Sequence, residues 1–392
     1  MKKLRYGIIG FGTQGKTYCD ILTGQPMAPG FPTASIPEHG CLTAVSTSDP
    51  QKAEGIRQRY PGVLVFTDWK ELIRSGTCDA VIPTVPHYFH HEIAIYAMEQ
   101  GISVLSEKPL GVRASQVRQM VDCAQNHPEV AFGVFFNQRA NKLYRKVKEL
   151  VSSGELGQIR RSNWMINTWW RPDSYYRQSP WRGTWAGEGG GVLVNQAPHQ
   201  LDLWLWICGV PCEVMSLNIN GAHRDIAVEN DVTLVTRYEN GATGCFITCT
   251  HDPIGTDRFE IDLSKGKIVV ENSKTATIYR LSQSEEEMNA SLSMQEAAML
   301  TRSNGAGGGL YTVETFESSD LWGYQHSTVI ENFALHCLEG TPLLAPGAEG
   351  LLSVQLANAS QLSAWQKHAV SFPCDEAAFN RELDQRIAAE GR

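Results

Sequence analysis

The sequence predicts an α/β protein whose N-terminal part is built on a buried parallel sheet and whose second part has a different strand pattern. Three observations lead to this fold class. Over roughly the first 150 residues, short apolar runs alternate with amphipathic stretches of helix length, which is typical of βαβ units. A glycine-rich turn joins the first strand to the first helix, and after about residue 155 short strands separated by turns replace the alternation. With 392 residues, the chain is long enough for two or three domains.

The elements of the N-terminal part follow in order from hydrophobic periodicity. The predicted strands are Leu4–Ile9, Cys41–Ser46, Val63–Phe66, Ala80–Pro83, Ile102–Leu105 and Val130–Phe135. The predicted helices are Thr13–Leu22, Gln51–Tyr60, His87–Glu99 and Ser115–Gln125. A stretch rich in Pro and Gly, 24–40, predicts a long loop before the second strand.

The turn after the first strand has the G-x-G-x-x-G spacing and consists of Gly10, Phe11, Gly12, Thr13, Gln14 and Gly15. This motif is weak evidence by itself, but here it directly follows a predicted strand and opens a predicted helix. Gly10 permits the tight turn, Gly12 lets the backbone approach a pyrophosphate, and Gly15 allows close helix–strand packing. The sequence therefore predicts a dinucleotide-binding turn rather than a glycine-rich turn without a ligand.

The end of the second strand is where an adenosine ribose would be bound. Thr47, Ser48 and Asp49 occupy this place, at a longer spacing from Gly15 than usual. Asp49 has two interpretations, as a ribose ligand or as an N-cap followed by Pro50 at the first helical position, and we favour the cap. Ribose contacts then fall to Thr47 and Ser48. No Arg stands at the strand end to meet a 2′-phosphate, so the expected cofactor is NAD, with NADP left open.

The composition restricts the classes of function. The net charge of −8 argues against nucleic-acid and anionic-membrane partners, which require clustered Lys and Arg. No apolar run approaches the ~18 residues of a membrane span, and the basic N-terminus lacks the apolar stretch of a signal peptide. The ten cysteines include no CxxC pair, so we expect reduced thiols, no structural metal and a cytoplasmic location.

Further along the chain, four motifs resemble those of the Gfo/Idh/MocA family of oxidoreductases. They are the Glu107-Lys108-Pro109 segment after the fifth strand, the Thr84–His90 loop, the 154–159 segment, and a run from Trp181-Arg182 through a triple glycine to His199 and Asp202. The resemblance covers most of the chain and is weakest over about 280–320. It implies an NAD(P)-dependent dehydrogenase acting on CH–OH groups, but it specifies no substrate.

The resemblance implies a Rossmann domain over 1–136 and a C-terminal α/β domain over 137–392 with a large, mostly antiparallel sheet. The residues after 155 agree, with predicted strands Glu213–Asn220, Asp231–Tyr238, Thr243–Thr250, Phe259–Leu263 and Lys267–Val270. Helical patterns follow at Val329–Leu338 and Gly350–Lys367, and in the family such late helices return to the first domain. The 304–309 segment is expected to be a flexible loop.

Lys108 and His199 are the predicted catalytic residues. A lysine at the carboxyl end of a strand can hydrogen-bond the hydroxyl being oxidised and stabilise developing alkoxide charge. Pro109 is expected to hold the Lys108 backbone extended. His199 suits proton transfer near neutral pH, and Asp202, three residues later, could orient its imidazole. No metal is expected, since no further His or Cys has ligand spacing.

The predicted cofactor-binding set combines the glycine-rich turn with the matched family loops. It comprises Gly10, Phe11, Gly12, Thr13, Gln14, Gly15, Thr47, Ser48, Thr84, Val85, Pro86, His87, His90, Glu107, Lys108, Asn137 and Gln138. One departure concerns the substrate: many family members have Asp where this chain has Asn195. An amide can both donate to and accept from a sugar hydroxyl, and the change places the base role on His199.

Tryptophans suggest the class of substrate, because seven of the ten lie between residues 164 and 206. Aromatic faces beside polar groups suit pyranose rings. We expect Trp204 and Trp206 to be core residues and the 169–185 segment to form a binding wall, wide enough for a glycoside. The predicted substrate-binding set is Lys108, Trp169, Trp170, Tyr176, Trp181, Arg182, Trp185, Asn195 and His199.

The leading hypothesis is hydride transfer between a nicotinamide cofactor and a hydroxyl of a sugar, glycoside or cyclitol. It includes oxidation of a glycoside at C3, with or without elimination of the aglycone, as some relatives do. The alternative is a non-catalytic dinucleotide or sugar sensor on the same fold, which the presence of Lys108 and His199 disfavours. The expected partners are a small-molecule carbohydrate and further copies of the chain, in a dimer or tetramer.

Overall fold

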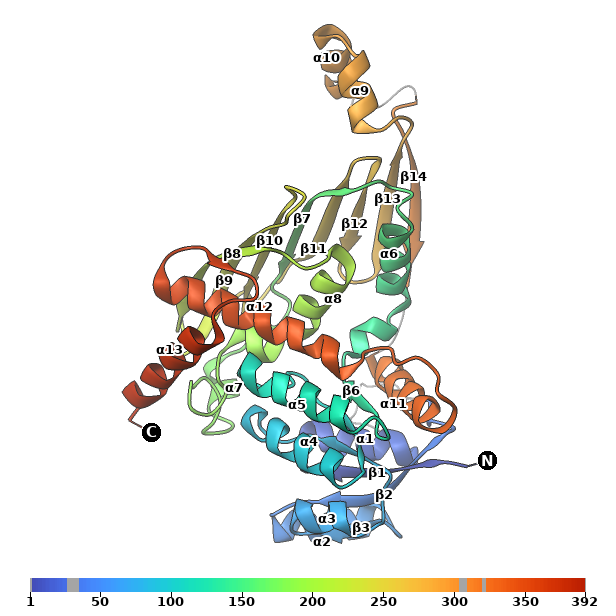
Figure 1. The fold of residues 1–392 in the computed structure, drawn as a ribbon, viewed down its shortest axis with the longest axis vertical. Coiled ribbons are helices and arrows are strands. Elements are labelled where there is room, and N and C mark those ends of the chain that lie inside the picture. The colour runs from blue at the N-terminus through green and yellow to red at the C-terminus, as the bar shows by residue number, and fades with distance from the viewer. Residues whose placement is uncertain (1, 27–34, 303–308, 319–321, 392) are drawn as a thin grey trace.

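The computed structural model describes residues 2–26, 35–302, 309–318 and 322–391, and shows two sheets joined by helices (Figure 1). The sequence-predicted 304–309 loop lies, except for Gly309, outside these residues. The first sheet has six parallel strands in the order β3-β2-β1-β4-β5-β6, and the second has nine strands in the order β14-β13-β12-β11-β7-β10-β9-β8-β15. The predicted α/β class, with a parallel N-terminal sheet, is confirmed.

The first sheet agrees closely with the predicted strands. Its strands are β1 (Leu4–Ile9), β2 (Gly40–Ser46), β3 (Leu64–Phe66), β4 (Ala80–Pro83), β5 (Ser103–Ser106) and β6 (Phe132–Val134). Its helices are α1 (Thr13–Thr23), α2 (Pro50–Arg59), α3 (Trp69–Arg74), α4 (His90–Glu99) and α5 (Ala114–Asn126). The predicted helix from His87 begins instead as a single 3₁₀ turn, His87–Phe89, before α4. Helix α3 was not predicted, although Asp68 caps it through the Lys70 amide.

The second sheet is mostly antiparallel, with β7 and β10 as its parallel pair among the described strands. Its strands are β7 (Ile159–Ile166), β8 (Glu213–Asn220), β9 (Glu229–Arg237), β10 (Thr243–Cys249), β11 (Asp257–Leu263), β12 (Gly266–Glu271), β13 (Thr275–Leu281), β14 (Tyr311–Glu317) and β15 (Val370–Ser371). The five predicted strands of this part are confirmed within two residues at each end.

Helices cover one face of the second sheet (Figure 1). They are α6 (Lys142–Ser153), α8 (Pro198–Cys208) and α12 (Gly347–Gln366), and α13 (Glu376–Ala389) packs on α12. Alternate residues of β8 point to the opposite face, where Met215, Leu217 and Ile219 are exposed. Helices α9 (Glu285–Ser291) and α10 (Met294–Arg302) extend beyond the end of the sheet. Among the described residues, no helix combines the length and apolar character that crossing a membrane requires.

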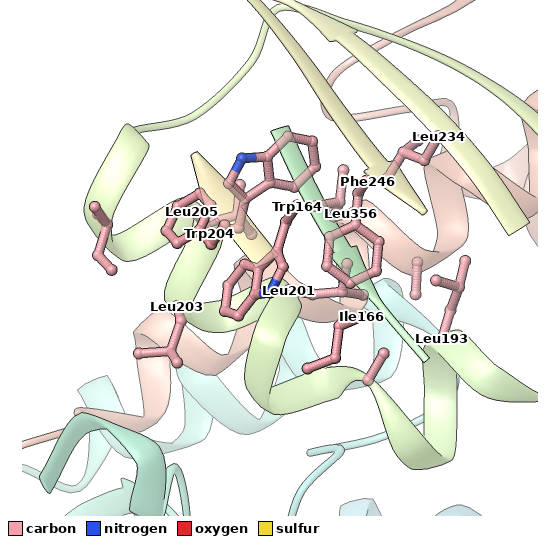
Figure 2. Close-up of a cluster of buried hydrophobic side chains, with 14 of the residues drawn as sticks. Trp164, Ile166, Leu193, Leu201, Leu203, Trp204, Leu205, Leu234, Phe246 and Leu356 are labelled. Carbon is pink, nitrogen blue, oxygen red and sulfur yellow. The ribbon is translucent and has the colours of Figure 1, made fainter. Parts of the chain in front are cut away.

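The core between this sheet and its helices is rich in aromatic side chains (Figure 2). Trp164 on β7 stacks on Phe259, with 4.4 Å between ring centroids, and its indole N–H donates to the Asp257 carboxylate at 3.1 Å. Trp204 on α8 is 1% exposed and donates to the Ser162 hydroxyl at 2.9 Å. Both buried indoles therefore have hydrogen-bond partners, as buried Trp requires.

The C-terminal part of the chain packs against the N-terminal sheet. Helix α11 (Trp322–Glu339) places Ile330 and Phe333 in the same core as Tyr6 and Ile8 of β1. The Tyr6 hydroxyl donates to the Ile330 carbonyl at 2.7 Å. Helix α12 contacts β6 and α5 as well as the second sheet. These helices bring the second domain close to the carboxyl ends of the first sheet's strands.

Candidate active site

A cavity of about 960 Å³ lies between the two domains. Residues just after or at the carboxyl ends of β1, β2, β4 and β5 line one side, which is where ligands bind in open α/β sheets. The second domain contributes Arg171, Trp181, Arg182, Asn195 and His199 to the other side. Sixteen of the seventeen predicted cofactor-binding residues line this cavity, and Gly15 is the exception.

Gly12 and Gly15 of the first turn have different spatial roles. A Cβ on Gly15 would lie 2.3 Å from the Gly10 carbonyl oxygen, so Gly15 holds the helix against the strand. A Cβ on Gly12 would meet no atom within 4 Å, because Gly12 faces the open cavity. Gly12 is also the N-cap of α1, whose first turn has no side-chain cap and no acidic residue. These open amides at a helix N-terminus fit the pyrophosphate of a dinucleotide.

The end of β2 fits the adenosine ribose. Thr47, Ser48, Asp49 and Lys52 line the cavity there. Asp49 is the N-cap of α2, accepting from the amides of Gln51 at 2.9 Å and Lys52 at 3.2 Å, as the favoured interpretation predicts. Asp49 nevertheless lines the cavity, so the cap and ribose roles are compatible. The Lys52 ammonium lies 3.9 Å from the Asp49 carboxylate, which balances its charge.

Lys108 is positioned at the domain junction. It follows β5, its peptide bond to Pro109 is cis, and its ammonium donates to the Asn195 carbonyl oxygen at 2.9 Å. Burial lowers the pKa of Lys108, while the nearby carboxylates of Glu107 and Glu188 raise it and so partly oppose this effect. The ammonium is thus held in the cavity by a group of the other domain.

His199 stands at the start of α8 and lines the same cavity. Burial, with the positive charge of Lys108, lowers its pKa well below the usual range for histidine. Its buried Nδ1 has no hydrogen-bond partner among the described residues. The imidazole is therefore neutral at pH 7 and available to accept a proton.

The expected pairing of Asp202 with His199 is wrong. The Asp202 carboxylate instead forms a bidentate, buried ion pair with Arg139, at 2.6 and 2.8 Å. Arg139 also contacts Glu349 at the start of α12. Asp202 therefore ties α8 to the segment that follows β6, because a fixed guanidinium fork offers a carboxylate a better partner than a neutral imidazole does.

Asn195 is the centre of a hydrogen-bond network that the sequence did not reveal. Its side-chain nitrogen donates to the Glu188 carboxylate and, at 3.2 Å, to the Tyr175 hydroxyl. Glu188 is 1% exposed, and burial raises its pKa to about 7. Its other carboxylate oxygen accepts from the Gly183 amide at 2.6 Å. The triple-glycine neighbourhood gave no signal for this role.

Some residues of the expected aromatic wall line the cavity and others do not. Trp181 and Arg182 line the cavity, whereas Trp169, Trp170, Tyr176 and Trp185 do not. Trp185 is 3% exposed and packs edge-on against Trp365, and Trp169 packs against the same core. Trp170 is exposed at the surface, and Tyr176 lines a neighbouring cavity. Irregular sequence between 169 and 185 offered no periodicity that separates core-facing from cavity-facing rings.

Several cavity residues were missed by sequence reasoning. They are Tyr18, Lys52, Trp69, Phe135, Arg171, Gln178, Ser179 and His326, among others. His326 comes from α11 and lowers the pKa of His199 through its charge. Tyr18 donates to Glu107 from within α1. Helical periodicity marks such residues as inward-facing, but it does not distinguish a core from a cavity.

Comparisons with known proteins agree with this architecture. The profile of the oxidoreductase family with an NAD-binding Rossmann fold (GFO_IDH_MocA) matches residues 4–136, and that of the GFO/IDH/MocA C-terminal domain matches residues 144–269. Levoglucosan dehydrogenase of Pseudarthrobacter phenanthrenivorans is 25% identical over 69% of this chain and 74% of its own length. Inositol 2-dehydrogenase of Corynebacterium glutamicum is 27% identical, but the alignment spans only 61% of this chain and 65% of that enzyme.

A solved structure shares the fold over nearly the whole chain. It is a levoglucosan dehydrogenase in complex with NADH and levoglucosan, with a TM-score of 0.75 at 21% identity, covering 94% of this chain and 99% of that one. Family profiles thus match both domains, and Lys108 and His199 line the same cavity as the glycine-rich turn. The chain therefore belongs to the Gfo/Idh/MocA family of NAD(P)-dependent oxidoreductases.

Proposed function

We propose that the protein oxidises a CH–OH group of a sugar, glycoside or cyclitol, or reduces the corresponding ketone. One observation carries this proposal. Lys108 from the first domain and His199 from the second line one cavity with the open α1 N-terminus around Gly12. The names of two similar enzymes, a levoglucosan and an inositol dehydrogenase, support the substrate class.

Different cavity residues would bind different parts of the cofactor. Gly12 and the α1 amides would hold the pyrophosphate, Thr47, Ser48 and Asp49 the adenosine ribose, and the β4–β5 ends the nicotinamide half. When bound, NAD supplies the two-electron acceptor for a hydride. We place NAD ahead of NADP because the Asp49 carboxylate, which caps α2 at the end of β2, would repel a 2′-phosphate.

The chain's own residues handle the hydroxyl proton. In oxidation, the substrate carbon loses a hydride and its oxygen loses a proton. His199 is neutral and lines the cavity beside Lys108, so it serves as the proton acceptor, and Lys108 stabilises the negative charge that develops on the oxygen. Asn195 holds a hydroxyl. Reduction uses the same residues in the opposite direction.

A glycoside is the finer substrate proposal. A second cavity of about 630 Å³ adjoins the first, because Ser179 and Arg182 line both, and Arg177 and Glu390 also line the second. A second sugar or an aglycone fits there. Oxidation at C3 would acidify the neighbouring C–H and permit elimination of the aglycone, and we keep this as the coupled variant of the proposal.

The test uses purified full-length protein with NAD and a panel of levoglucosan, myo-inositol, methyl glucosides and aryl glucosides. NADH formation that depends on a carbohydrate supports the proposal, and it should be lost in Lys108→Ala and His199→Ala. NADH binding without turnover on any member of the panel, in either direction, would contradict it and favour a sensor. Mass spectrometry of the products separates a 3-keto glycoside from a released aglycone.

We further propose a homo-oligomer acting in the cytoplasm. The face of the second sheet opposite α12 exposes Met215, Leu217, Ile219 and Val235, an apolar face that a second copy would cover. The ten cysteines are all free, which suits a reducing compartment. Light scattering of the wild type and of Leu217→Glu tests the oligomer: a mass that is monomeric in the wild type would contradict it.

A further inference from the structure

We propose that Glu188 is a positioning residue that turns the Asn195 amide so that its oxygen, Oδ1, faces the cavity and accepts a hydrogen bond from a substrate hydroxyl. This inference rests on the proposed function for its kinetic readouts. Glu188 is not among the cavity-lining residues, so it acts through Asn195 rather than by touching substrate.

The network around Asn195 fixes the orientation of its amide. Both hydrogens of Nδ2 are used, one toward the Glu188 carboxylate and one toward the Tyr175 hydroxyl at 3.2 Å. An ionised carboxylate only accepts hydrogen bonds, so the amide nitrogen has to face it. The remaining side-chain atom, Oδ1, is then the one available to the cavity. The Asn195 main-chain oxygen meanwhile accepts from Lys108 at 2.9 Å.

Glu188 itself cannot turn away. Its second oxygen accepts from the Gly183 amide at 2.6 Å, and a backbone N–H has a fixed direction. The Glu188 main chain is held as well, since its carbonyl oxygen lies 3.1 Å from the His87 Nδ1 and its amide donates to the Thr184 carbonyl at 2.9 Å. Because the Glu188 carboxylate is fixed as an acceptor, it determines that the Asn195 side-chain nitrogen, and not its oxygen, faces it.

Because of this geometry, Glu188→Gln should reverse the orientation of the Asn195 amide rather than simply remove a hydrogen bond. The Gly183 amide can be met only by the oxygen of the introduced amide, so its NH₂ group must face Asn195. Asn195 then has to present Oδ1 to that NH₂, and its own nitrogen turns toward the cavity. A substrate hydroxyl that must donate would meet a donor instead.

The charges facing Glu188 give the arrangement a pH dependence. Burial raises its pKa to about 7, while Arg182 and Lys108 oppose this with their positive charge, and Tyr176 and His87 complete the titratable surroundings. A protonated Glu188 can donate to Asn195 and so permits the reversed amide. The acceptor therefore faces the cavity above about pH 7 and is lost below it.

The kinetic experiment compares wild type, Glu188→Gln and the double variant Glu188→Gln/Asn195→Asp on the best carbohydrate of the panel. We expect Glu188→Gln to lower kcat/KM by about 10- to 100-fold, mainly through KM, the cost of leaving a buried hydrogen-bonding group mismatched. The double variant restores an acceptor on the cavity side and should recover to within about tenfold of wild type, the factor carried by a single ordinary hydrogen bond. No loss in the single variant, or no recovery in the double variant, overturns the proposal.

Glu229→Gln is the matched control. Glu229 is also a fully buried carboxyl with its pKa raised to about 7, and it also accepts from a glycine amide, that of Gly191 at 2.9 Å. Within the described part of the chain, its carboxylate accepts from Gly191 and Gln361 rather than from Asn195, and Glu229 does not line the cavity. Its variant should keep kcat/KM and the pH profile of the wild type. An equal loss of kcat/KM in both variants would mean that replacing any buried carboxyl in this region lowers activity, and it would overturn the specific role of Glu188.

A neutron structure of the deuterium-exchanged wild type at pH 8 decides the orientation without any turnover. We expect deuterium on the Asn195 atom that faces Glu188 and none on the atom that faces the cavity. The opposite arrangement overturns the inference. If no carbohydrate is turned over, the proposed function fails while this measurement still decides the orientation of Asn195.

Discussion

Replacement of Gly12 by valine separates cofactor binding from folding more sharply than other changes in the first turn. Gly12 has φ −85° and ψ −164°, an extended conformation that valine readily adopts, and a Cβ there meets no atom within 4 Å. We therefore expect the free energy of unfolding to change by no more than about 0.5 kcal/mol, as at open surface positions. The valine methyl groups would instead occupy the space next to the α1 amides.

The loss of cofactor affinity follows from what those amides contribute. A hydrogen bond to a charged group contributes about 1.5–3 kcal/mol, and a helix N-terminus adds up to about 2 kcal/mol for an anion. Excluding the pyrophosphate from one amide and from the helix end thus costs about 1.5–5 kcal/mol, or at least about tenfold in Kd. Calorimetric titration with NADH, and urea unfolding on the same samples, measure the two quantities.

Gly15→Ala is the control with the opposite expectation. Its Cβ would lie 2.3 Å from the Gly10 carbonyl oxygen and 2.7 Å from the Thr84 hydroxyl, so α1 must move away from the sheet. We expect a loss of about 1–3 kcal/mol in unfolding free energy, as for other overpacked sites. Unchanged NADH affinity in Gly12→Val, or a stability loss there as large as in Gly15→Ala, would refute the reasoning.

Four further predictions concern the site and its support. Lys108→Ala and His199→Ala should each lower kcat by roughly 10²–10⁴-fold, as for a positioned proton-transfer group. The double variant should lose less than the product of the two single losses, because both residues act on one oxygen. Steady-state NADH formation measures both effects. Trp185→Ala should destabilise the fold by about 3–5 kcal/mol in urea. Asp202→Ala should cost about 3–5 kcal/mol, since it leaves Arg139 buried without its bidentate partner. The pH profile of kcat/KM should fall below about pH 7 as Glu188 gains its proton, and Glu188→Gln should show no such fall.

Each of these has an outcome that contradicts it. Near-normal turnover of His199→Ala across the pH range would move the base role to Tyr175, which contacts Asn195, or to a bound water. A Trp185→Ala protein with wild-type stability and a raised KM would mean that the Trp185 ring contacts the substrate instead of stabilising the core. Wild-type stability in Asp202→Ala would mean that Glu349 alone satisfies Arg139. An acid limb that persists unchanged in Glu188→Gln would assign it to another group.

Much of the first domain is predictable because its signals are local. The strand, glycine turn and helix from Leu4 to Thr23 follow one another in sequence, so periodicity and the G-x-G-x-x-G spacing suffice to place Gly12 at a helix N-terminus. The same holds for Asp49 and Pro50, whose capping role depends on the next three residues. Lys108 was placed correctly at a strand end for the same reason.

The tertiary structure alone decided which polar groups meet across the chain. Asp202 was expected beside His199, but it pairs with Arg139, which lies 63 residues away. The Glu188 carboxylate accepts hydrogen bonds from Gly183 and Asn195, and the irregular segment that contains these residues has no periodic pattern from which the contacts could be predicted. Trp181 and Trp185 stand four residues apart, yet one lines the cavity and the other packs on Trp365.

The physical reason is the range of the interactions. Hydrophobic periodicity records which face of an element is turned inward, and helix caps and tight turns are satisfied by neighbours along the chain. A buried carboxylate or ring instead finds its partner among segments that only folding brings together, and many partners would satisfy it equally well. The sequence by itself thus determined the sheet, the dinucleotide turn and the two catalytic candidates, whereas the hydrogen-bond network around the Asn195 amide exists only once the segment from Tyr175 to Asn195 has folded.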